Sequence, residues 1–168
     1  MRLFYLSILL ILLNSLIAQN SWDVYSKDYN YGILPKQKIE EDYNGNLRIY
    51  DKDYQYGLVP RQEWRKGFGN SYEVYDKEYD YGIFPKQKIE KDFSGDYKVY
   101  DKDYNFGITP KLKIEKGFSN EYKVYDKEYN YGLIPRQTIK ERSDGTIEVY
   151  DKTYNYGLTP YKVIKKQR

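Results

Sequence analysis

A unit of 25 residues, repeated six times without an insertion or a deletion, is the feature that most limits how this chain can fold. One tyrosine marks the same place in every copy: Tyr25, Tyr50, Tyr75, Tyr100, Tyr125 and Tyr150. A lysine, a glycine and a proline recur two, seven and ten residues after it. A fixed period in the twenties indicates tandem structural repeats, each of which buries its apolar side against its neighbours.

A weaker period of 50 residues lies over the first. One turn position alternates between asparagine and glycine, as Asn20, Gly45, Asn70, Gly95, Asn120 and Gly145. This alternation fits two interpretations, which the sequence leaves open. Either a pair of units was duplicated as a block, or neighbouring units are built in two slightly different ways.

The first eighteen residues differ in composition from the rest of the chain. A cationic start at Arg2 is followed by an apolar run from Leu3 to Leu13 and by a small residue at Ala18. This order is typical of a secretory signal peptide, and the run is shorter than the roughly 20 residues that a spanning helix needs. We therefore expect a secreted or cell-surface protein, although an uncleaved N-terminal anchor stays open.

Cleavage after Ala18 leaves 150 of the 168 residues, which is six times 25. The signal peptide, residues 1–18, thus ends where the repeats begin, and residues 19–168 form the repeat region. The six units are residues 19–43, 44–68, 69–93, 94–118, 119–143 and 144–168.

Each unit has the pattern of two short β-strands. In the fourth unit Tyr97 and Val99 alternate with Lys98 and Tyr100, the period of two expected of a strand with one apolar face. Dipeptides such as Asn44-Gly45 precede this strand in alternate units and suit tight hairpins, because glycine and asparagine accept positive φ. A wider turn closed by glycine follows the strand. Beyond the signal no stretch carries a helical apolar stripe, so the sequence predicts an all-β protein.

Two architectures fit this pattern. In the favoured one, six β-hairpins form an antiparallel meander or open repeat array of twelve short strands. In the alternative, each unit is one coil of a β-solenoid. A membrane-spanning barrel is not expected, because its strands need about 9 to 11 residues and an apolar outer face. After signal cleavage we thus expect no membrane span, and an open array that tolerates removal of residues 69–118.

Three columns of apolar residues define the expected inner face. They are Trp22, Leu47, Tyr72, Tyr97, Tyr122 and Ile147; Val24, Ile49, Val74, Val99, Val124 and Val149; and Ile39, Trp64, Ile89, Ile114, Ile139 and Ile164. An open sheet leaves such a face in contact with water. We therefore expect the sheet to curl, to dimerise, or to be roofed by the wide-turn aromatics Tyr29, Tyr31 and their equivalents.

The absence of histidine and cysteine removes several kinds of chemistry. It excludes Ser-His-Asp and Cys-His nucleophiles, zinc sites of the usual ligands, and disulfides. Carboxylates recur in every unit, whereas an active site needs one special constellation. We therefore expect no enzyme, and we assign no catalytic, cofactor-binding or metal-binding residue and no cofactor.

One segment resembles the start of a calcium loop. Asp101, Asp103 and Asn105 have the spacing of its first three ligands. Such a loop also requires glycine at its sixth position and glutamate at its twelfth, where this chain has Phe106 and Leu112. The aspartates are therefore expected to shape a turn.

Tyrosine and lysine are the remaining signal for function. Tyr100 and Lys102 project from the face opposite Val99, and the other units repeat them. Such a stripe can stack on sugar rings, hold an acidic polymer, or only pack tyrosine rings on lysine stems. The candidate ligand-binding residues are Tyr50, Lys52, Tyr75, Lys77, Tyr100, Lys102, Tyr125 and Lys127.

The leading hypothesis is an exported non-enzymatic repeat protein that binds a polymer, first of all carbohydrate, or another cell-surface polymer. The alternative is a structural surface or matrix protein that self-associates through open sheet edges or a wet apolar face. Nucleic acid is not an expected partner, because without Arg2 the 27 basic residues exceed the 25 acidic ones by only two.

Overall fold

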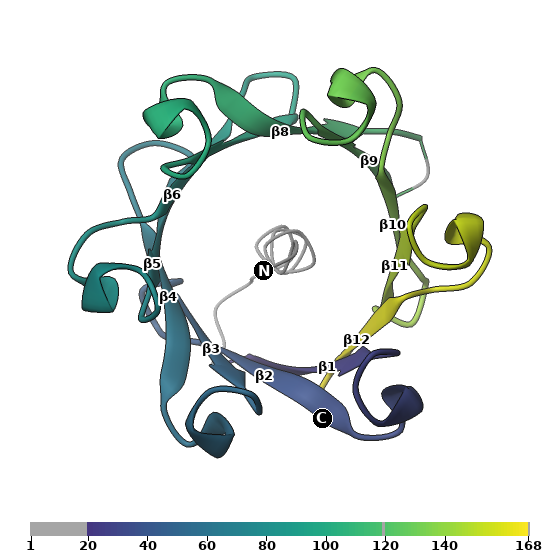
Figure 1. Cartoon of the computed structure of the whole chain (residues 1–168). Helices are drawn as coiled ribbons and strands as arrows, with labels where there is room; N and C mark the ends of the chain where they lie inside the picture. The colour runs from purple at the N-terminus through teal and green to yellow at the C-terminus, as the bar shows by residue number, and fades with distance from the viewer. Residues whose placement is uncertain (1–19, 119, 168) are drawn as a thin grey trace.

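Twelve antiparallel strands close into a barrel in this computed structural model, which describes residues 20–118 and 120–167 (Figure 1). The predicted signal peptide lies outside the described residues. The strands are β1 (Ser21–Ser26), β2 (Pro35–Glu41), β3 (Leu47–Asp51), β4 (Pro60–Lys66), β5 (Ser71–Asp76), β6 (Gln87–Lys91), β7 (Tyr97–Asp101), β8 (Pro110–Lys116), β9 (Glu121–Asp126), β10 (Gln137–Glu141), β11 (Ile147–Asp151) and β12 (Lys162–Lys166). Within the described residues no helix has the length and apolar character to cross a membrane.

The predicted all-β hairpin pattern is confirmed, but the open array was wrong. Each strand pairs with its neighbours in sequence, and β12 pairs with β1 from Trp22↔Lys166 to Ser26↔Lys162. The solenoid alternative was also wrong, since it requires the same strand of successive units to pair. Of the three ways to cover the apolar face, the structure uses curling: closure gives both end strands a partner and turns the apolar columns inward.

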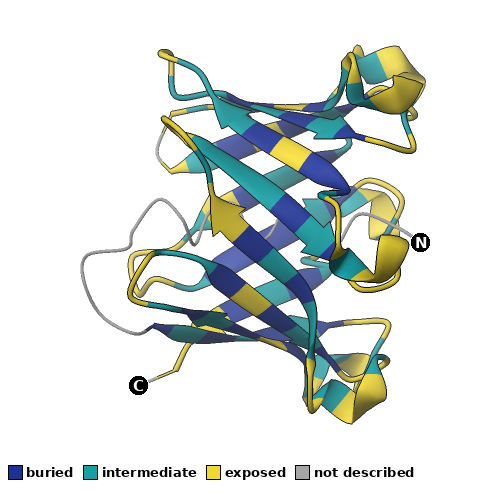
Figure 2. Ribbon diagram, turned by 90° about the vertical axis from the view of Figure 1, so that its left-hand side faces the viewer, coloured by how far each residue is buried: buried dark blue, intermediate teal, exposed yellow. Residues whose placement is uncertain are grey.

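The two ends of the barrel carry different connections. Wide loops join the two strands of each unit at one end, and tight turns join successive units at the other (Figure 2). Each wide loop contains a short 3-10 turn: η2 (Asn30–Gly32), η3 (Gln55–Gly57), η4 (Asp80–Gly82), η5 (Asn105–Gly107), η6 (Asn130–Gly132) and η7 (Asn155–Gly157). Asp101 shapes the start of its loop as expected, because its Oδ1 accepts the backbone N–H of Asp103 at 2.9 Å.

The tight turns account for the 50-residue period. In one kind, the Oδ1 of Asp42 accepts the N–H groups of Asn44 and Asn46, both at 2.9 Å. Asp92 does the same in the turn 50 residues later. The turns that alternate with these begin at Gly67 and Gly117, where the chain runs close to its partner strand. Neighbouring units are thus built in two ways.

The expected inner face is confirmed. All members of the three apolar columns are buried except Tyr72, which is partly buried and packs against the others. The wide-turn aromatics do not roof this face, since Tyr31 is 81% exposed.

A polar layer follows the apolar columns at the wide-loop end. In four units a buried glutamine donates from Nε2 to an aspartate Oδ2 on the next strand: Gln37–Asp51, Gln62–Asp76, Gln87–Asp101 and Gln137–Asp151. The pair where the barrel closes is different, because Lys162 lies opposite Ser26. The layer thus departs from the glutamine–aspartate pattern at two places: at the closure, and between β8 and β9, where Leu112 lies opposite Asp126.

Charged contacts link each of the first four units to the wide loop of the next. The Nζ of Lys36 lies 3.1 Å from Asp53, and Lys86–Asp103 and Lys111–Glu128 follow at 2.9 and 3.0 Å. Arg61 pairs with Glu78 in the same way. Arg136 of the fifth unit pairs with Asp126 and Asp151 instead, because the sixth loop has Thr153 in place of a carboxylate. At the closure the Tyr161 hydroxyl donates to Asp28 at 2.9 Å in place of an ion pair. The contacts therefore continue across the two ends of the chain.

Lys162 makes stability depend on pH. Burial lowers its pKa from 10.5 to about 8, although Asp28, Asp51 and Asp151 oppose the shift. The folded chain then binds fewer protons than the unfolded chain between these two values, so stability rises with pH there. Lys162→Gln should remove this rise. Between about pH 7 and about pH 9.5, the free energy of unfolding of the wild type should increase by about 2 kcal/mol relative to that of the variant.

Urea midpoints of both proteins at each pH measure this difference. Burial raises the pKa of Tyr97 and Tyr122 above 10, so these groups reduce stability only at higher pH. Parallel pH profiles for the two proteins would contradict the burial of an uncharged Lys162.

Candidate functional site

The eight candidate residues lie on or beside the outer face of the barrel. Tyr50, Tyr75, Tyr100 and Tyr125 are on β3, β5, β7 and β9, and all four are half-buried. Lys52, Lys77, Lys102 and Lys127 follow these strands at the start of the wide loops and are exposed. The alternation of each strand sets the tyrosines against the buried valines, as predicted.

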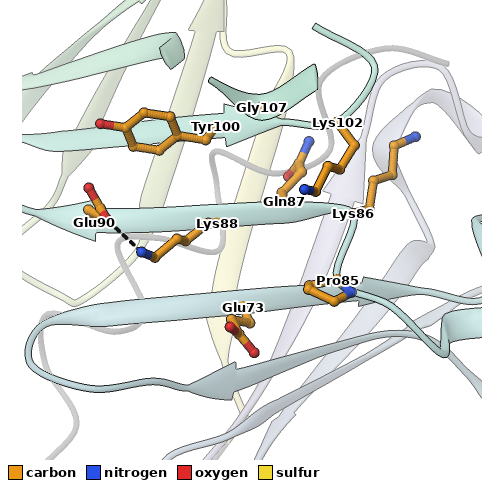
Figure 3. Close-up of a pocket in the computed structure, with 9 residues that line it drawn as sticks. All are labelled: Glu73, Pro85, Lys86, Gln87, Lys88, Glu90, Tyr100, Lys102 and Gly107. Atoms are coloured by element: carbon orange, nitrogen blue, oxygen red, sulfur yellow. Dashed lines mark ion pairs between the residues drawn. The ribbon is translucent and has the colours of Figure 1, made fainter. Parts of the chain in front are cut away.

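Tyr100 and Lys102 line the same pocket, which has a volume of about 420 Å³ (Figure 3). Its floor crosses three strands, since Glu73 on β5 pairs in register with Lys88 on β6, and Lys88 with Tyr100 on β7. Glu90 lies beside this row, and its carboxylate is 2.7 Å from the Lys88 Nζ. Lys86 and Lys102 also line the pocket, so one aromatic ring lies among three lysines and two carboxylates.

Tyr125 and Lys127 line an equivalent pocket of about 380 Å³ one unit further on. Lys113 and Glu115 replace Lys88 and Glu90 there, and their ion pair again measures 2.7 Å. Lys98 occupies the place of Glu73. The two pockets therefore have similar volumes and the same aromatic residue but differ in charge.

The other two predicted pairs are arranged differently. The guanidinium carbon of Arg65 lies 4.1 Å from the ring centre of Tyr75, so a cation already covers this ring. Lys52 lines a hollow of about 470 Å³ between two wide loops, together with Tyr29, Pro35 and Tyr56. Tyr50 is not among the residues that line this hollow.

The outer tyrosines fall into two groups according to what contacts them. Cations lie over Tyr25, Tyr75 and Tyr150, from Lys165, Arg65 and Lys140 respectively. For Tyr50, Tyr100 and Tyr125 the corresponding position is Glu40, Glu90 or Glu115, which hydrogen-bonds the hydroxyl. Burial and this glutamate both raise the pKa of each of the three, so their rings are neutral at physiological pH. Their ring faces have no described cation over them.

The lysine column also has a structural role. The stem of Lys102 lies over the wide loop, where a Cβ on Gly107 would be 3.5 Å from its Cδ. Gly107 has φ of +72°, a conformation that favours glycine. This packing recurs at the equivalent glycines. The lysine and the glycine are therefore repeated in every unit partly because the wide loop needs them to pack.

Sequence reasoning missed two features of this surface. It did not predict which outer tyrosine rings are covered by a cation. The residue type at one column would have indicated this, because residues 40, 90 and 115 are glutamate and residues 65, 140 and 165 are basic. It also considered the wide-loop aromatics only as a roof over the core, one of three ways to cover that face, and not as an exposed surface. In the part of the chain that the structure describes, no group of three or more metal-ligating side chains could hold a metal ion. Compared with known protein families and with curated proteins, the chain matches none.

Proposed function

We propose that this is an exported, non-enzymatic repeat protein that binds a polymer through the pockets on the outside of its barrel. The observation that carries the proposal is that Tyr100 and Lys102 line one pocket, and that Tyr125 and Lys127 line its equivalent on the next unit. Equivalent pockets at successive units suit a ligand that itself repeats. Several weak contacts on one rigid body then act together through effective concentration.

Carbohydrate fits the chemistry of these pockets best. An aromatic ring supplies a stacking surface for a sugar, while Lys88 and Glu90 supply a donor and an acceptor for its hydroxyl groups. An acidic sugar polymer fits as well as a neutral one, because lysines outnumber carboxylates in both pockets: Lys86, Lys88 and Lys102 against Glu73 and Glu90 in one, and Lys98, Lys113 and Lys127 against Glu115 in the other.

The self-assembly alternative gains no support from the arrangement of the strands. Each described strand has a partner on both sides, so the barrel offers no free edge to another chain. The apolar columns lie inside the barrel, so they are not available for association either.

Replacing Tyr50, Tyr100 and Tyr125 together with Ser should abolish most polymer binding. If each stacked ring contributes about 1 kcal/mol, the triple change weakens binding by about 3 kcal/mol, or roughly a hundredfold in Kd. A glycan array would identify a ligand, and titration of the purified variants with that ligand would measure the loss.

The matched control replaces Tyr25, Tyr75 and Tyr150 with Ser. These rings occupy the same column but are covered by cations, so binding should change little. Both triple variants lose three outer tyrosines and should have similar thermal stability. Equal loss of binding by the two variants, or an array without any hit, would count against the proposal.

A further inference from the structure

The wide loops expose one aromatic and one aliphatic side chain in every unit. The aromatics, Tyr31, Tyr56, Tyr81, Phe106, Tyr131 and Tyr156, are 81% to 86% exposed. The aliphatic residues two positions later are also exposed: Ile33, Leu58, Ile83, Ile108, Leu133 and Leu158. We call these twelve residues the tip ring. Apolar side chains that recur exposed on one end of a protein mark an interaction surface.

The fold does not explain the aromatic residues of the tip ring. Each has a positive φ, between 52° and 55°, a region that a bulky side chain rarely adopts. Asparagine or glycine would fit this conformation with less strain. The six aromatics are also too exposed to stabilise the core. A residue type that the backbone disfavours and the core does not use is best explained by contact with something outside the chain.

The arrangement of the tip ring suits a broad, flat partner. All six wide loops lie at one end of the barrel and are distributed evenly around it (Figures 1 and 2). A surface that meets this end can therefore contact six tips at once. A bilayer surface has this form, and tyrosine is enriched where hydrocarbon meets the headgroups.

The charges beside the tip ring favour an anionic surface. In the described residues, five of the six loop carboxylates each pair with a cation at the start of a strand: Asp28, Asp53, Glu78, Asp103 and Glu128. Asp80 in the third loop is exposed and forms no such pair. The loop lysines form no such ion pairs there, and all are exposed: Lys27, Lys52, Lys77, Lys102, Lys127 and Lys152. Six lysines without carboxylate partners thus lie next to the apolar tips.

We propose that the tip ring docks the wide-loop end of the barrel on an anionic phospholipid bilayer. The aromatic and aliphatic tips enter the interfacial region, and the loop lysines contact the headgroup phosphates. This docking uses a different surface from the polymer-binding pockets and does not depend on them.

Vesicle sedimentation tests the proposal on the chain from residue 19, which contains all twelve strands of the closed barrel. Vesicles of equal parts phosphatidylcholine and phosphatidylglycerol should bind the protein, and added salt should weaken the binding. Tyr81→Ser, Phe106→Ser and Tyr131→Ser combined should lower the binding constant at least about tenfold. The matched control combines Phe68→Ser, Phe93→Ser and Phe118→Ser, which removes three exposed aromatics from the opposite end. Its binding should equal that of the wild type.

Three results would overturn the proposal. The first is a wild type that does not sediment with these vesicles, and the second is equal loss of binding in both triple variants. The third comes from sedimentation equilibrium without lipid: if the wild type associates and the tip variant does not, a second copy of the chain occupies the tip ring. Loss of polymer binding in the Tyr50, Tyr100 and Tyr125 variant leaves this docking unaffected, so the two proposals fail separately.

Discussion

Removal of residues 69–118 is expected to abolish cooperative folding, although it leaves four intact units. The open array predicted the opposite result. In a closed barrel the diameter grows roughly in proportion to the number of strands, so the enclosed cross-section grows with its square. Eight strands would enclose less than about half of the original cross-section but keep two thirds of the inward side chains. Large inner residues such as Trp22, Trp64 and Tyr122 would then be overpacked.

Circular dichroism in the near ultraviolet and thermal unfolding would measure this loss, with size exclusion to detect association. The control is a circular permutant in which residue 168 is joined to residue 19 and the chain is opened between residues 143 and 144. It keeps all twelve strands and should unfold cooperatively. A monomeric deletion variant with a sharp transition would show that the strand number is not fixed.

Joining residue 168 directly to residue 19 is expected to raise stability by up to about 5 kcal/mol, because it removes the freedom of a 150-residue loop in the unfolded state. The junction needs no linker. The N–H of Gln167 donates to the carbonyl of Ser21 at 2.8 Å, and the equivalent bond in a covalent tight turn joins Asp42 to Asn46 at 2.9 Å. Gln167 and Ser21 thus already have the backbone pairing that flanks a tight turn.

Urea unfolding of the linear and cyclic chains of residues 19–168 would measure the gain, which is large beside the 5 to 15 kcal/mol typical of a whole domain. A cyclic chain cut between residues 143 and 144 is the matched control and should return to the stability of the linear chain. A cyclic chain no more stable than the linear one would indicate that the ends are strained when joined, or that the unfolded chain keeps them close.

The parts of the fold that could be predicted, the strands, their inner face and the tight turns, depend on residues close together in the sequence. The alternation around Val99 placed the strand and its inner face, and Gly45 and Gly95 marked tight turns. Closure could not be predicted in the same way, because it depends on the twist and stagger accumulated over twelve strands. The residues that depart from the repeat in β1 and β12, such as Ser26 and Lys162, could be matched with each other only once these two strands were known to pair.

The candidate site was predictable in part for a similar reason. The outward direction of Tyr75 and Tyr100 follows from strand alternation alone. Whether a ring is covered depends on the neighbouring strand, where Arg65 lies over Tyr75 and Glu90 hydrogen-bonds Tyr100. The register between strands therefore had to be known before the two tyrosines could be told apart.

The unusual residues at the β1–β12 junction bear on which hairpin closes the barrel. The interior units resemble one another, so a strand from an earlier unit could pair with β1 by backbone hydrogen bonds alone. At the junction the contacts differ: Lys162 faces Ser26, Tyr161 meets Asp28, and the Gln167 side chain bonds Ser21 and Asp23. A hairpin from any other unit placed beside β1 would lack these partners. The residues that break the repeat thus make the last unit, rather than an earlier one, the partner of the first.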